Sequence, residues 1–73
     1  MGLFKVYVHL LNEGTTVLRP VNSLKVGEDR YLLQKPEDYD SEDEEWEFLP
    51  ESVVICDKEL HESSEILVAK RLV

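Results

Sequence analysis

Acidic side chains are concentrated in one short stretch of this sequence. Residues 36–47 hold eight of the 16 acidic residues and no lysine or arginine, so the remaining acids are balanced by all eight bases of the chain. A run of carboxylates can bind a divalent cation, dock onto a basic partner, or stay solvated and keep a domain soluble. The eight acids are Glu37, Asp38, Asp40, Glu42, Asp43, Glu44, Glu45 and Glu47.

The spacing of these acids does not match an EF-hand calcium loop. Asp38, Asp40 and Glu42 fit its first three ligand positions, but Asp43 stands where the loop needs glycine and Leu49 where it needs glutamate. We therefore expect no metal site here, and docking of a basic partner and plain solvation stay open. The candidate contact residues for a basic partner are Asp40, Glu42, Asp43, Glu44, Glu45 and Trp46.

His9, His61 and Cys56 carry the other reactive groups. A single cysteine excludes an internal disulfide and a zinc site of several cysteines. A cysteine beside a histidine can form a nucleophile, so a small enzyme or metal-binding protein that uses these residues or the loop carboxylates is the alternative hypothesis. Cys56, however, follows three apolar residues and suits a core position. We predict no catalytic residue and no cofactor.

Trp46 and Arg19 each have a structural and a functional interpretation. Trp46 suits either a core anchor or an aromatic contact for a bound peptide. Arg19 alternates with Val17 and Val21 on an inward face, so it must lie at a barrel rim or pair with a carboxylate. We expect Glu13 or Glu47 as its partner, and recognition of an external carboxylate or phosphate is the alternative.

Direct nucleic-acid binding is not expected. The eight basic residues are scattered along the chain, and only Lys70 and Arg71 are adjacent. No basic stripe with interleaved aromatic residues is present, and the acidic residues at 36–47 would repel phosphate.

The elements that must position these groups are strands. Phe4, Val6, Val8 and Leu10 alternate with polar residues at period two, which is typical of a strand with one buried face. A turn follows, in which Gly14 is expected to take a positive φ. Further turn chemistry covers residues 22–29 and 50–52, and residues 36–45 are expected to form a mobile acidic loop. Strands are expected at 3–11, 15–21, 30–34, 53–59 and 66–73, with a short extended piece at 46–48.

Five or six short antiparallel strands without an amphipathic helix predict an all-β fold, a small barrel or roll, because curling removes the unpaired edges of a flat sheet. A chain of 73 residues is expected to form one domain, residues 1–73, with little room for a deep active-site cleft. The sequence has no apolar run long enough to span a membrane and no secretory leader, which favours a cytoplasmic protein.

Two blocks of residues carry a resemblance to other proteins. The first block is VYVHLL at 6–11, EGT at 13–15 and RPV at 19–21, and the second is DEEWEF at 43–48 with VVIC at 53–56. Together they resemble a group of short uncharacterised bacterial proteins over residues 6–57. The resemblance implies a small SH3-like β-barrel and a bacterial cytoplasmic origin, and it implies no activity. The group's pattern has glycine in the turn where this chain has Pro50, Glu51 and Ser52, which puts the geometry of that turn in doubt.

Taken together, these patterns predict a non-catalytic SH3-like interaction module of unknown cellular role, with the acidic loop as the docking surface for a basic protein. No membrane association is expected. The chain is expected to be a monomer or a homodimer, and the apolar residues opposite the core face could support the dimer. These residues are Leu3, Tyr7, Leu11 and Leu18.

Overall fold

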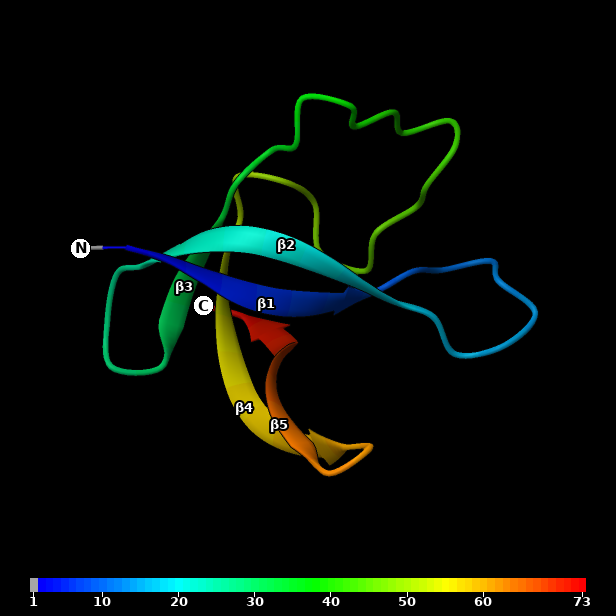
Figure 1. Cartoon of the computed structure of the whole chain (residues 1–73). Helices are drawn as coiled ribbons and strands as arrows, with labels where there is room; N and C mark the ends of the chain where they lie inside the picture. The colour runs from blue at the N-terminus through cyan, green and yellow to red at the C-terminus, as the bar shows by residue number, and fades with distance from the viewer. Residues whose placement is uncertain (1) are drawn as a thin grey trace.

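Five strands and no helix make up the computed structural model, which describes residues 2–73. The strands close into a barrel in chain order, with each strand beside the next and β5 beside β1 (Figure 1). The predicted all-β barrel is therefore confirmed. The strands are β1 (Leu3–His9), β2 (Leu18–Lys25), β3 (Arg30–Leu33), β4 (Val53–His61) and β5 (Ser64–Leu72).

The barrel closes through a parallel pair. β1 and β5 run in the same direction and are paired at Val6–Leu67 and Tyr7–Val68, whereas the four other strand pairs are antiparallel. The prediction of a purely antiparallel barrel is therefore wrong at this seam. The reason is one of parity, because five strands that alternate in direction bring the first and the fifth together with the same direction.

The core is built from the inward positions of the strands. Val6 and Val8 are fully buried, as the period-two alternation of β1 predicts. Phe4 was expected inward as well, but 41% of its surface is exposed. Its ring makes an edge contact with Tyr31, at 5.7 Å between ring centroids, and the Lys25 ammonium lies over it, at 5.9 Å from the centroid. The core cluster comprises Val6, Val8, Val21, Tyr31, Leu33, Trp46, Val54, Cys56 and Ala69.

β2 lies further along the chain than the sequence predicts. It begins at Leu18 and continues to Lys25, so only residues 26–29 of the turn expected at 22–29 lie outside a strand. The sequence pattern does not indicate this continuation of the strand, because Ser23 is a polar residue at an inward position, where it is fully buried. Its hydroxyl donates to the Val21 carbonyl at 3.4 Å, which gives the buried group a partner. Pro20 is tolerated in β2 because β3 pairs with β2 only from Ser23 onward.

The turns use non-glycine residues at positive φ. Asn12, with φ of 60°, takes the conformation that was predicted for Gly14, and asparagine is one of the few side chains that adopts it readily. Glu62 and Ser63 both have positive φ in the two-residue connection of β4 to β5, as a type I′ hairpin requires. Glu51, with φ of 71°, lies in the confirmed turn before β4.

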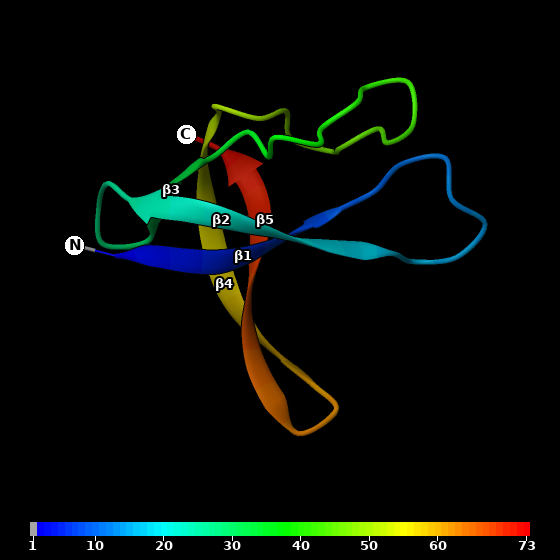
Figure 2. The same cartoon turned by 45° about the horizontal axis from the view of Figure 1, so that its top comes forward.

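The long connection from β3 to β4 contains the acidic segment, residues 36–47. It lies at the end of the barrel opposite the tip of the β4–β5 hairpin (Figures 1 and 2). As predicted, residues 36–45 contain no strand or helix; their mobility stays a prediction. The expected extended piece at 46–48 is reduced to one isolated bridge between Trp46 and Leu10, so it does not form a sixth strand.

Candidate functional site

The second half of the acidic segment is attached to the end of β1. The Leu11 amide donates to the Glu45 carbonyl at 2.7 Å, and the Glu47 amide donates to the His9 carbonyl at 2.9 Å. The side-chain amide of Asn12 also donates to Glu45 Oε1 at 2.7 Å. These bonds hold the backbone around Trp46 against the barrel.

Trp46 is a core residue rather than an exposed contact. Only 2% of its surface is accessible, and its indole Nε1–H donates to Glu44 Oε1 at 3.1 Å. Tyr39 packs edge-on against its ring, with centroids 5.1 Å apart. The structural interpretation of Trp46 therefore holds, and Trp46 does not belong to the exposed surface that a partner would first meet.

Arg19 pairs with the acidic segment. Its Nε lies 2.9 Å from Glu44 Oε1, its Nη2 lies 3.5 Å from Asp38 Oδ1, and its guanidinium carbon lies 5.7 Å from the centroid of the Trp46 ring. The Nε atom is buried, but its N–H is not directed at the nearby oxygen, so this contact is an ion pair without a hydrogen bond.

The partners predicted for Arg19 were wrong, although its place at the rim and its pairing with a carboxylate are confirmed. Glu13 and Glu47 do not contact it, because the acidic segment folds back over the barrel end and brings Asp38 and Glu44 to it. We call this group of contacting residues the Arg19 cluster. It comprises Arg19, Asp38, Tyr39, Glu44 and Trp46.

Three exposed carboxylates lie on a single turn that we call the loop tip, comprising Asp40, Glu42 and Asp43. The amides of Asp43 and Glu44 both donate to the Asp40 carbonyl at 3.0 Å, and the Glu42 amide donates to Asp40 Oδ1 at 2.9 Å. All three residues are exposed, and none forms an ion pair with another described residue of the chain. The structure thus divides the six predicted contact residues, leaving three at the tip and placing Glu44, Glu45 and Trp46 in contacts with the barrel.

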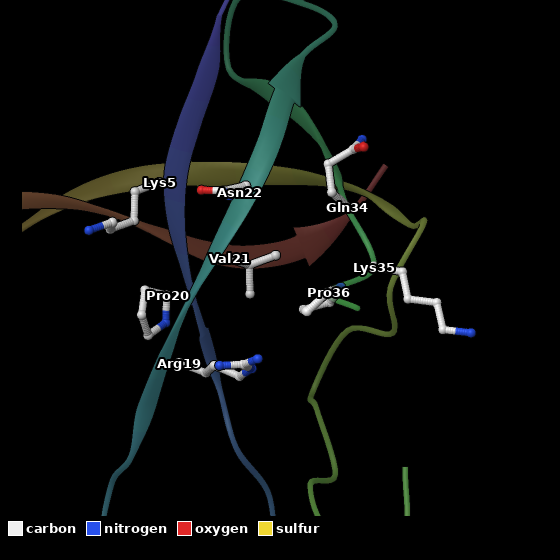
Figure 3. Close-up of a pocket in the computed structure, with 8 residues that line it drawn as sticks. All are labelled: Lys5, Arg19, Pro20, Val21, Asn22, Gln34, Lys35 and Pro36. Atoms are coloured by element: carbon white, nitrogen blue, oxygen red, sulfur yellow. The ribbon is translucent and has the colours of Figure 1, made fainter. Parts of the chain in front are cut away.

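A cavity of about 310 Å³ lies beside Arg19 (Figure 3). Its charged lining residues, Lys5, Arg19 and Lys35, are all basic, which sequence reasoning missed because they lie far apart in the chain. In Figure 3 the side chains of Lys5 and Lys35 extend from opposite sides of β2 and point away from each other. They therefore do not converge on one point where a small anion could be held.

Cys56 is buried in β4 and is not activated. Burial, together with the negative charges of Asp57 and Asp29, raises the pKa of its thiol to about 11. This shift is opposite to the one that a nucleophilic thiolate needs.

No hydrogen bond joins either histidine to this thiol among the described residues. His61 lies five positions along the same extended strand, about 16 Å away at an ordinary strand rise, and its ring contacts Glu59 at 2.8 Å. His9 ends β1. Among residues 2–73, no group of three or more histidine, cysteine, aspartate or glutamate side chains is arranged to hold a metal ion.

The residues predicted to support a homodimer are only partly accessible. Leu3 and Leu11 are exposed, whereas Tyr7 and Leu18 are half-buried. The oligomeric state stays a prediction.

Comparison with known proteins gave no matching family model, no similar curated protein and no similar solved structure. No helix long and apolar enough to cross a membrane occurs in the described part of the chain.

Proposed function

We propose that this chain is a non-catalytic interaction module whose loop tip docks onto a basic protein partner. The observation that supports this proposal is the contrast within the acidic segment. Asp38 and Glu44 are paired with Arg19, whereas the tip residues Asp40, Glu42 and Asp43 are exposed on one hydrogen-bonded turn without a cation of their own. Exposed carboxylates form their strongest hydrogen bonds with lysine and arginine side chains.

Electrostatics supports a lysine- and arginine-rich partner over a nucleic acid. The whole negative excess of the chain resides in the acidic segment, and the three acids of the tip are exposed. Such a concentrated charge accelerates encounter with a basic surface and repels phosphate, and the effect weakens as salt increases.

The test is a calorimetric titration of the full chain with an oligolysine peptide, which measures the binding affinity at low and at high salt. A variant with Asp40→Asn, Glu42→Gln and Asp43→Asn should lose about tenfold or more in affinity at low salt. The matched control neutralises Glu13, Glu28 and Glu65, which are exposed acids outside the segment, and should lose less than about threefold.

Equal losses in the two variants would show a response to net charge only and would contradict docking at the tip. Unchanged binding by the tip variant would contradict it as well.

The kind of barrel and its compartment belong to the same proposal. We propose an SH3-like barrel that works in the cytoplasm of a bacterium, supported by five short strands that close in chain order and by the resemblance of residues 6–57. An experimental structure whose strands do not superpose on an SH3-like barrel would contradict the first part.

A further inference from the structure

We infer that Arg19 is a latch that holds the acidic segment closed over Trp46, and that a basic partner opens it by taking Asp38 and Glu44 from Arg19. The inference rests on the proposed function, because it describes what docking does to the same segment. The opened segment would uncover the faces of Tyr39 and Trp46 as aromatic contacts for the partner.

The contacts of the Arg19 cluster join two parts of the fold that are distant in sequence. Arg19 belongs to β2, and the other members belong to the connection between β3 and β4. One carboxylate oxygen, Glu44 Oε1, faces both Arg19 Nε at 2.9 Å and the indole Nε1–H of Trp46 at 3.1 Å. Loss of this one group from its place would therefore leave the Trp46 indole N–H without its acceptor, and would leave Arg19 paired with Asp38 alone among the described residues.

The geometry of the latch suits release. The Arg19 Nε–H is not directed at Glu44, and the contact of Nη2 with Asp38 is long, at 3.5 Å. Arginine holds a carboxylate best through two parallel hydrogen bonds, and neither carboxylate here is held in that way. The side chain of Asp38 is 86% exposed and that of Glu44 is 30% exposed, so an incoming lysine or arginine can reach both.

The loop tip places the partner beside the latch. The amides of Asp43 and Glu44 share the Asp40 carbonyl as acceptor, so the tip and Glu44 belong to one turn. A cation that binds the tip therefore lies next to Glu44. A multivalent basic segment would then compete with Arg19 at a high effective concentration.

What opens is the segment and not the barrel. Tyr39 contacts Trp46 by its ring edge at 5.1 Å, and Arg19 lies over the same indole ring. Opening removes Tyr39 from the Trp46 ring, whereas Arg19 stays on β2 and the strand pairs of the barrel do not involve the acidic segment.

The experiment is hydrogen exchange by NMR on the full chain, with and without the oligolysine peptide. The Trp46 Nε1–H reports the latch, and the Cys56 amide, which donates to the Asp29 carbonyl at 3.0 Å, reports the barrel. The peptide should accelerate exchange at Trp46 Nε1–H by about tenfold or more and leave the Cys56 amide unchanged. Quenching of the single tryptophan by acrylamide should rise in parallel.

Two variants without peptide test Arg19 itself. Arg19→Lys keeps the charge but loses the planar guanidinium and the Nε atom, so Trp46 Nε1–H should exchange faster than in the unaltered chain by about threefold or more. Glu37→Gln is the matched control in the same segment, and it should exchange like the unaltered chain because Glu37 is exposed and contacts neither Arg19 nor Trp46. If Arg19→Lys does not fold, the titration of the unaltered chain remains the test.

The outcomes separate the two proposals. Peptide binding in calorimetry without a change at Trp46 Nε1–H overturns the latch and leaves the proposed function standing. Equal acceleration at Trp46 and at the Cys56 amide means that the whole barrel opens, and this also overturns the latch. Absence of any peptide binding overturns the proposed function, and partner-driven opening fails with it.

Discussion

The two halves of the acidic segment have similar composition and different surroundings. Residues 36–43 and residues 44–47 each carry several acids and one aromatic residue. In the first half Tyr39 is half-buried and the acids are exposed, whereas in the second half Trp46 is a core residue and Glu44 is half-buried. The difference follows from the backbone hydrogen bonds to the end of β1 and from the contact of the Trp46 ring with Arg19, both made by the second half. The first half contacts Arg19 only through the exposed side chain of Asp38, among the described residues.

The largest expected difference between the halves concerns their aromatic residues. Trp46→Ala should lower the free energy of unfolding by about 3–5 kcal/mol, because it empties a large fully buried site. Tyr39→Ala should cost about 1–2 kcal/mol, because the ring is only half-buried. Urea unfolding followed by circular dichroism measures both values. Similar losses would show that the two halves are anchored equally.

The second prediction concerns Cys56, which packs in the same core cluster as Trp46. Burial and the nearby charges of Asp57 and Asp29 raise the pKa of this thiol to about 11, above its ordinary value of 9.0. A group whose pKa is raised on folding contributes stability below its unfolded pKa, and this contribution is lost as the pH rises through the folded pKa. The free energy of unfolding should therefore fall by up to about 3 kcal/mol between about pH 9 and pH 11.

The control for this pH dependence is Cys56→Ala, in which the other groups titrate as before. The alkaline fall should be smaller in this variant than in the unaltered chain, as measured by urea unfolding at several pH values. Identical pH profiles would mean that the thiol is not buried as described.

The third prediction compares adjacent acids on either side of the boundary between the halves. Glu44→Gln should cost about 1 kcal/mol, because it removes the charge that faces Arg19 in a half-exposed setting. Asp43→Asn should change stability by less than about 0.5 kcal/mol, because this carboxylate is exposed and unpaired among the described residues. Thermal unfolding of the two variants measures both changes in stability. Equal changes would remove the distinction between the loop tip and the Arg19 cluster.

The smallest effect is expected in the turn that follows the segment. Glu51 has a φ of 71°, which costs a residue with a side chain about 1–2 kcal/mol. Glu51→Gly relieves this strain but adds freedom to the unfolded chain, so a net stabilisation of about 0.5 kcal/mol is expected. A higher melting temperature would agree with this strain, whereas a lower one would contradict it.

Much of the barrel could be predicted from the sequence because its signals are local. The alternation of Val6 and Val8 correctly identifies the buried face of β1. Ser23 was missed because a buried hydroxyl resembles a turn residue when only polarity is considered. Asn12 and Gly14 are close enough that either could take the positive φ, and the choice depends on how the chain returns to β2.

The site was less predictable because its contacts are distant in sequence. The inward position of Arg19 indicated that it needs a carboxylate, but eight nearby acids of equal chemistry offered no local sign of which one would reach it. Glu44 is the acid that pairs with Arg19 because Trp46, two residues later, is buried in the core. This burial fixes the direction of the backbone between Glu44 and Trp46. The division of the acids between the exposed loop tip and the Arg19 cluster is therefore a property of the tertiary structure.

The parallel pairing of β1 with β5 also has a consequence for the order of folding. Val6 and Leu67 are about 60 positions apart in the chain, whereas β4 and β5 are joined by a two-residue hairpin. The entropy lost on bringing such distant partners together is recovered only after the intervening hairpins have shortened the path between them. We therefore expect the ring to close last during folding and to open first during unfolding, at the junction of its first and last strands.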